Sequence, residues 1–187
     1  MNWTDTKSNI TMENVGPANL ACCGIGCLTS PKHQGYQPRV EWLQKRFREG
    51  LRIPLFRDGG GRPLAFLEYV PGEYAWRPVQ AKSWLFVHCL WVFPREQKVG
   101  GLGGRLIRAC VEEARQARAI GVAAMVSDGP WMAAREVFLG NGFTQIGETE
   151  KLEFNFSAME TPANGRRDYT NCPRSSIADK PCWCWWR

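Results

Sequence analysis

One stretch, residues 84–120, limits the fold more than any other part of the chain. Residues 84–93 are almost wholly apolar and rich in aromatic side chains, which predicts a buried strand. From Leu102 onward, apolar residues recur every three or four positions, which predicts a helix that Gly121 ends. The segment 97–105 joins the two and holds four glycines. The order is therefore strand, glycine loop, helix.

Such a loop favours an anionic ligand. Glycines let a ligand approach the backbone closely, and a helix start offers unpaired N–H groups at the positive end of its dipole. Phosphate is the anion that these features suit best. A P-loop would need Lys where Arg105 stands, and a dinucleotide fingerprint would need a third glycine where Leu106 stands. What remains is Lys-x-x-Gly-x-Gly, formed by Lys98, Gly101 and Gly103, with Gln97-x-x-Gly100 as an overlapping register.

Length and composition suit one domain followed by a tail. The chain has 187 residues, of which 44% are hydrophobic. It has no run of 18 apolar residues and no signal-peptide core at its N-terminus, so we expect a cytoplasmic protein without a membrane partner. The domain is expected to cover residues 1–157, and residues 158–187, which lack periodicity, form an irregular tail.

The net charge and the cysteine content limit the classes of ligand that the chain is expected to bind. The net charge of +6 suits a polyanionic ligand, but Lys and Arg are scattered, which argues against nucleic acid. The eight cysteines are expected to be thiols. Cys22, Cys23 and Cys27 leave a thiol or metal site open as an alternative, although the scarcity of histidines favours packing and no metal is expected.

The remaining pattern alternates between short strands and helices. Asp58-Gly59-Gly60-Gly61 separates two strands and predicts a hairpin, and residues 1–9 are expected to fray. The other predicted strands and helices are, by range, strands at 10–15, 51–56, 63–70, 122–126, 143–148 and 151–156, and helices at 38–50 and 131–141.

Three ordered motifs together resemble the GCN5-related N-acetyltransferase (GNAT) superfamily. They are Val92-x-Pro94, the loop motif of Lys98, Gly101 and Gly103, and the segment 134–143, a short helix that runs into Gly142-Phe143. The first half is similar to the YoaP-like branch, through Cys22-Cys23, Gly35-Tyr36-Gln37, Glu41-Trp42-Leu43, 66–71, Ala75-Trp76 and Pro78-Val79.

The resemblance implies an α/β (α+β) fold with a mixed, mostly antiparallel central sheet flanked by helices. It also implies acetyl-CoA as co-substrate, bound by the central strand and the loop. The residues expected to contact it are Trp91, Val92, Phe93, Lys98, Val99, Gly100, Gly101, Leu102, Gly103, Gly104 and Arg105. A backbone N–H within 91–93 would stabilise the developing oxyanion.

The chain departs from the superfamily pattern at three positions. Pro94 stands one residue farther from the loop than is usual, Trp131 replaces a common Asn, and Phe138 replaces a common Tyr. A tyrosine can protonate the departing thiolate, whereas phenylalanine cannot.

Two residues are candidates for catalysis. Glu68 is a carboxylate within an apolar strand, which is costly unless it is paired or faces a cleft, and a solvated strand face is its alternative. His88 lies on the central strand, where we expect Phe86, Leu90 and Val92 on its face and Cys89 on the other. A structural histidine is the alternative role for His88.

These observations predict an N-acetyltransferase that acts by direct attack of a primary amine of a small molecule or amino acid on acetyl-CoA. The protein is expected to be a monomer or a homodimer. A catalytically weak acyl-CoA-binding or sensing module and a thiol or metal-binding protein remain alternatives.

Overall fold

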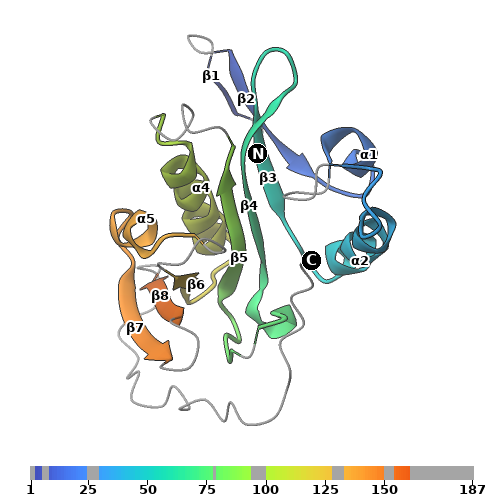
Figure 1. The fold of residues 1–187 in the computed structure, drawn as a ribbon. Coiled ribbons are helices and arrows are strands. Elements are labelled where there is room, and N and C mark those ends of the chain that lie inside the picture. The colour runs from blue at the N-terminus through green and yellow to red at the C-terminus, as the bar shows by residue number, and fades with distance from the viewer. Residues whose placement is uncertain are drawn as a thin grey trace.

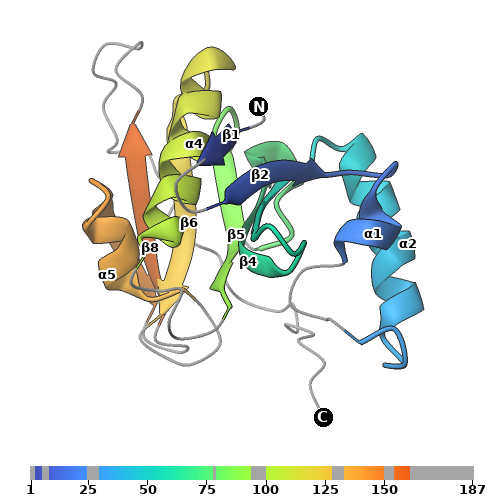
Figure 2. The ribbon, with the colours of Figure 1, turned by 90° about the horizontal axis from the view of Figure 1, so that it is seen from above.

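The computed structural model describes residues 3–5, 9–24, 30–77, 79–93, 100–127, 133–149 and 154–160. They form one eight-stranded sheet with helices on both faces (Figures 1 and 2). The elements in chain order are β1 (Trp3–Asp5), β2 (Ile10–Val15), α1 (Leu20–Cys23), α2 (Tyr36–Arg48), β3 (Ile53–Arg57), β4 (Pro63–Pro71), the 3-10 turn η1 (Gly72–Tyr74), β5 (Leu85–Val92), α4 (Leu102–Gln116), β6 (Gly121–Ser127), α5 (Arg135–Leu139), β7 (Thr144–Thr149) and β8 (Phe154–Glu160).

The sheet follows the order β1-β2-β3-β4-β5-β6-β8-β7. Among the described strands, β5 and β6 form the only parallel pair. Long connections such as α4 are needed between parallel strands, whereas tight turns join antiparallel ones. The prediction of a mixed, mostly antiparallel sheet flanked by helices is confirmed.

Two hydrophobic clusters hold the layers together. On one face, α4 packs against β4, β5 and β6 through a stripe that includes Leu106, Cys110 and Ala114, each fully buried. On the other face, α1 and α2 cover β3 and β4, and Leu43 of α2 is fully buried among strand side chains. The sheet therefore separates an α4 side from an α2 side, as Figure 2 shows.

Several element boundaries differ from the predicted ones. The long helix ends at Gln116 rather than near Ile120, because Arg118 adopts a left-handed φ of 56°. Gly121, expected to stop that helix, instead begins β6. Helix α2 begins two residues before Pro38, which still lies in its first turn. The short helix α5 covers only Arg135–Leu139.

Both chain ends differ from expectation as well. Trp3–Asp5, expected to fray, pairs with β2 as an edge strand. The last strand, β8, continues to Glu160 and so passes the expected domain boundary at 157 by three residues. The rest of the expected tail, together with Cys27, Lys98 and Val99, lies outside the described residues. No helix within the described ranges has both the length and the apolar character needed to cross a membrane.

Candidate active site

The sheet opens at its one parallel seam. β5 and β6 pair only through Leu85–Val87 and Val122–Ala124, yet β5 continues to Val92 and β6 to Ser127. A small cavity of about 30 Å³ lies where they part, lined by Val87, His88, Cys89, Leu90, Trp91, Met125, Ala133 and Phe138. We call this place the gap.

A β-bulge at His88 marks the start of the gap. Cys89 pairs with Glu68 and Val87 pairs with Tyr69, so His88 has no partner residue on β4. The extra residue shifts the side-chain alternation of β5. Leu90 and Val92 therefore join the α4 side, whereas Phe86 contacts His88 on the other face.

The prediction that His88 shares a face with Leu90 and Val92 is therefore wrong. Cys89, expected on the opposite face from His88, packs against the α2-side cluster instead. Strict alternation along a strand holds only without a bulge, and the sequence of β5 carries no glycine that would have marked one.

Beyond Val87, the β5 edge that faces the gap has no paired strand among the described residues. The Phe93 N–H donates to the Leu64 carbonyl oxygen at 2.8 Å, so it is used by β4. Successive residues of a strand direct their N–H groups to opposite sides, which turns the Val92 N–H away from β4 and towards the gap. Of the three expected contacts Trp91, Val92 and Phe93, Val92 is the one with an N–H on this edge.

The start of α4 lies against the same part of β5. Gly101 is the N-cap with φ 65°, a conformation that favours glycine. The first helical hydrogen bond runs from the Arg105 N–H to the Gly101 carbonyl at 3.1 Å, so the N–H groups of 102–104 have no acceptor within the helix. A Cβ on Gly103 would lie 3.6 Å from the side chains of Leu90 and Val92. The sequence-predicted anion site and the gap are therefore neighbours.

Glu68 lies beside the bulge on the α2 side and is only 4% exposed. Arg39 of α2 donates a hydrogen bond from Nη2 to Glu68 Oε2 at 2.6 Å, and its guanidinium lies 4.4 Å from the Trp42 ring. Burial raises the pKa of the Glu68 carboxyl, while the charge and hydrogen bond of Arg39 offset part of that rise. The structure thus shows a paired, buried carboxylate rather than a solvated strand face.

His88 is held by aromatic rings. Its imidazole stacks on Trp76 with ring centroids 3.4 Å apart, and Trp76 in turn meets Trp42 edge to face at 4.6 Å. Burial, followed by the charges of Arg77 and Arg39, lowers the pKa of His88 to about 2. The ring is therefore neutral at physiological pH and poorly suited to accept a proton there.

Phe138 of α5 forms part of the gap wall. It is 1% exposed and meets Phe143 edge to face at 5.1 Å. Its ring occupies the wall without any hydroxyl, so it offers no proton to a leaving thiolate.

A second cavity, of about 340 Å³, lies between α1 and the sheet on the α2 side. Cys22, Cys23, Tyr36, Phe66 and Phe93 are among its lining residues. Burial, followed by Glu13, raises the pKa of the Cys23 thiol, which argues against a reactive thiolate. Within the described ranges, no group of three His, Cys, Asp or Glu residues lies close enough to hold a metal.

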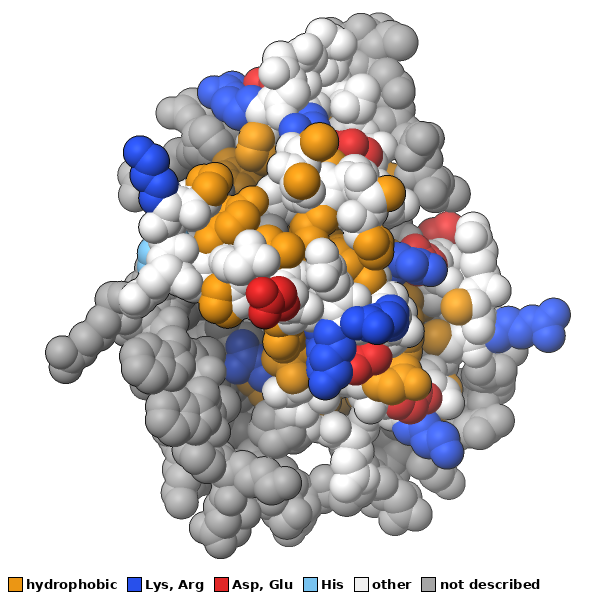
Figure 3. Space-filling view, turned by 90° about the vertical axis from the view of Figure 1, so that its right-hand side faces the viewer, with side chains coloured by type: hydrophobic (Ala, Val, Ile, Leu, Met, Phe, Trp, Pro, Cys, Tyr) orange, Lys and Arg blue, Asp and Glu red, His pale blue; other side chains and the backbone are white. Residues whose placement is uncertain are grey.

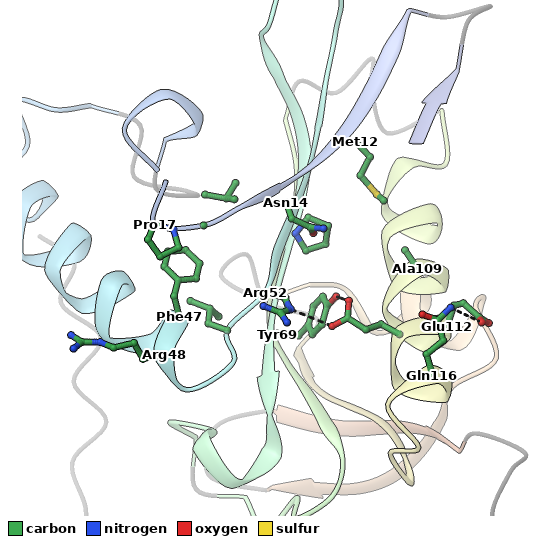
Figure 4. Close-up of a pocket in the computed structure, with 15 residues that line it drawn as sticks. Met12, Asn14, Pro17, Phe47, Arg48, Arg52, Tyr69, Ala109, Glu112 and Gln116 are labelled. Carbon is green, nitrogen blue, oxygen red and sulfur yellow. Dashed lines mark hydrogen bonds and ion pairs between the residues drawn. The ribbon is translucent and has the colours of Figure 1, made fainter. Parts of the chain in front are cut away.

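A third cavity, of about 620 Å³, lies beside the C-terminal half of α4, away from the gap (Figure 4). The Tyr69 hydroxyl donates to Glu113 Oε2 at 2.7 Å, and Arg52 Nε lies 3.5 Å from Glu113 Oε1. These three polar side chains satisfy one another.

Sequence reasoning missed Arg39, Trp76 and Arg77. The available signal was Glu68 itself, since a carboxylate in an apolar strand calls for a cationic partner. Neither the partner nor the rings that hold His88 could be located from spacing, because Arg39 lies 29 residues from Glu68 in the chain.

Comparison with known proteins shows what the chain resembles in sequence and in fold. The chain is 29% identical over 161 residues to the uncharacterized N-acetyltransferase YoaP of Bacillus subtilis (strain 168), covering 85% of this chain and 60% of YoaP. It therefore spans less than two thirds of that curated relative. No protein-family model matches the chain.

Solved structures share the fold. The acetyltransferase yncA from Salmonella typhimurium, solved with its cofactor acetyl-CoA, matches with a TM-score of 0.61 and 15% identity, over 86% of this chain and 99% of that one. A ribosomal-protein-alanine N-acetyltransferase from Brucella melitensis matches with a TM-score of 0.55 and 17% identity, over 80% and 99%.

Proposed function

We propose that this chain, which belongs to the GCN5-related N-acetyltransferase superfamily, transfers the acetyl group of acetyl-CoA to a primary amine of a small molecule. The observation that carries the proposal is the gap between β5 and β6, with the glycine-capped start of α4 against its edge. A strand edge that directs the Val92 N–H into the gap, beside the proposed anion site, suits a long ligand with a pyrophosphate at one end.

In this proposal the coenzyme pyrophosphate lies at the start of α4. The N–H groups of Leu102, Gly103 and Gly104 would donate to it, with Arg105 adding positive charge. Lys98, Val99 and Gly100 are proposed to complete the loop around it. The thioester would lie along the free edge of β5, where the Val92 N–H stabilises the oxyanion that forms during attack.

Proton transfer is assigned to the α2 side. The amine must lose a proton to attack, and Glu68 is the carboxylate nearest the bulge, with a pKa raised by burial. We assign it the general-base role, directly or through a water. His88 is the weaker candidate, since its lowered pKa leaves it little affinity for a proton at neutral pH. The thiolate would take its proton from solvent, because Phe138 cannot supply one.

The acceptor would enter from the α2 side. The 340 Å³ cavity reaches Phe66 and Phe93, which lie on β4 and at the end of β5. Binding both substrates in attack geometry is itself a large catalytic term. Free thiols at Cys22, Cys23 and Cys110 suit a reducing compartment, and we propose the cytoplasm.

A second candidate function is a coenzyme-binding or sensing module with weak catalysis. Phe138, buried in the gap wall, is the observation that favours it, because the module would lack an acid for the leaving group. Release of free thiol from acetyl-CoA in the presence of an amine library separates the two. Turnover above hydrolysis supports the enzyme, and tight binding without turnover supports the module.

The coenzyme site is tested by a matched pair of variants, Gly101→Asp and Gly101→Asn. Asp and Asn both tolerate a left-handed φ, and a Cβ at Gly101 has nothing within 4 Å. The two variants therefore differ chiefly by one negative charge. We expect Asp to weaken acetyl-CoA binding about tenfold more than Asn, because it places a like charge beside the pyrophosphate. Equal affinities, measured by calorimetry, would remove the coenzyme from this helix start.

A further inference from the structure

Among the three cavities described above, the cavity at the gap is the smallest and has mostly apolar walls. It encloses about 30 Å³, and apart from His88 and Cys89 every residue that lines it is apolar. A cavity needs about 10–15 Å³ to hold a water-sized group, so this one has room for little more than a single methyl. Its walls favour a hydrocarbon group over a polar one.

The lining residues place this cavity within the plane of the sheet. Leu90 and Phe138 belong to the α4-side cluster, whereas Met125 packs with Phe86 on the opposite face. β5 supplies one wall, and Met125 of β6 with Phe138 of α5 supplies much of the other. The cavity therefore lies beside the β5 edge along which the thioester is proposed to run.

The wall across from β5 is held in place from two sides. The Ser127 N–H, at the end of β6, donates to the Ala133 carbonyl oxygen at 3.3 Å. Arg108 of α4 donates from Nη1 to Oδ1 of Asn141, just beyond α5, at 3.0 Å. Between these two attachments, Phe138 is 1% exposed. Because close-packed interiors yield little to added atoms, a longer chain would meet the Phe138 ring rather than displace it.

We propose that this cavity holds the methyl end of the donor's acyl group, and that Phe138 and Met125 thereby restrict the donor to acetyl-CoA. The inference rests on the proposed position of the coenzyme along β5 and adds donor selectivity to it. Propionyl and butyryl groups carry further methylenes, each of which must push a wall side chain aside or turn out of the cavity. One methylene too many in an apolar pocket reduces selectivity for that substrate by about 10- to 200-fold.

The acyl cavity is separate from the proposed acceptor cavity. Among the described residues, the two have no lining residue in common. The α2-side face, with apolar side chains at its centre and charged ones beside them, is shown in Figure 3. The described residues of the acyl cavity include none from α1 or α2, the helices on that side. Donor selectivity should therefore change without a change in acceptor preference.

The experiment measures affinities for acetyl-CoA, propionyl-CoA and butyryl-CoA by calorimetry with the full chain, which requires no acceptor. We expect propionyl-CoA to bind at least about tenfold more weakly than acetyl-CoA, and butyryl-CoA more weakly still. Phe138→Leu, which makes the wall smaller, should bring the acetyl-to-propionyl affinity ratio towards one. Met125→Val should lower the same ratio from the β6 side, independently of α5.

Phe143→Leu and Met12→Val are the matched controls. Phe143 belongs to the same cluster as Phe138 and meets its ring edge to face, yet it does not line the cavity. Met12 is 7% exposed, as is Met125, and lies away from the gap. Both controls should leave the ratio intact. A ratio near one in the unmodified chain, a ratio unchanged in both cavity variants, or one that falls equally in Phe143→Leu would overturn the inference.

Thiol release in the presence of the amine library judges the acetyltransferase proposal separately. Selective binding of acetyl-CoA without turnover would support the acyl cavity while the transferase proposal fails. Turnover with equal use of the three thioesters would overturn the inference while the transferase proposal stands. If none of the three thioesters binds, the coenzyme site and the acyl cavity are both overturned.

Discussion

The two sides of the sheet build their parts of the candidate site in different ways. The α4 side draws on one continuous stretch, in which β5, the glycine loop and the helix start follow one another in the chain. The α2 side assembles Arg39, Glu68, Trp76 and His88 from separate elements. Local sequence can therefore specify the proposed coenzyme side, whereas the proposed acceptor side depends on tertiary packing. Four experiments test this division.

The largest expected effect is on turnover in Glu68→Gln. Gln keeps the size of the side chain and can still accept the Arg39 hydrogen bond, so the fold should persist. Loss of a general base should lower kcat about 10²–10⁴-fold while coenzyme affinity stays unchanged. His88→Gln is the comparison and should slow turnover less. If the two variants exchange these results, His88 is the base and the α2 side has been assigned incorrectly.

A second effect concerns stability. Arg39→Met removes the partner of a carboxylate that is 5% exposed at its side chain, and should cost about 3 kcal/mol of unfolding free energy at pH 7. In urea titrations, the double variant with Glu68→Met should recover much of that loss, since no buried charge remains. A double variant no more stable than Arg39→Met would show that the pair is worth little and that packing alone holds α2 to the sheet.

The third expected effect is a loss of folding stability in acid, through the buried imidazole of His88. The pKa of His88 is near 2 in the folded chain and about 6.5 when unfolded, so the unfolded state binds more protons between these values. Neutral His88 therefore does not lower the free energy of unfolding above pH 6.5. Below that pH, its linkage lowers the free energy of unfolding by up to about 1.4 kcal/mol per pH unit. Glu68, with a raised pKa, acts in the opposite direction, while Arg39 and Arg77 stay charged.

This slope can be assigned by replacing His88 with Phe, which should flatten the acid limb of the stability curve measured by thermal melting. A curve with the same slope in the His88→Phe variant would assign the acid sensitivity to other groups.

The smallest effect is expected from removing residues 161–187. Every strand among the described residues ends by Glu160, so the truncated chain should keep its sheet and its coenzyme affinity. Truncation after 157 is the sharper comparison, because it removes the β8 residues that pair with Gly121, Val122 and Ala123 of β6. A melting temperature that falls equally in both truncations would place part of the cooperative core beyond residue 160.

The sequence predicted most of the fold because its periodicities are strong. The apolar run at 84–93 and the helical stripe from Leu102 specified the centre, and the glycine loop specified the likeness to the superfamily. Helix ends were less certain, since Arg118 takes a left-handed φ without being glycine. The bulge at His88 was not predictable, because one extra residue in an apolar strand leaves no compositional trace and changes every side-chain direction after it.

The short pairing between β5 and β6 has a mechanical consequence. Three residues on each strand join the half of the sheet that runs from β1 to β5 to the half formed by β6, β8 and β7. Beyond them, the β5 edge has no paired strand among the described residues. The proposed coenzyme, lying along this edge, would act as an additional strand. Its binding would link the two halves of the sheet. Cooperative unfolding of the two halves would then depend on the bound ligand as well as on the polypeptide.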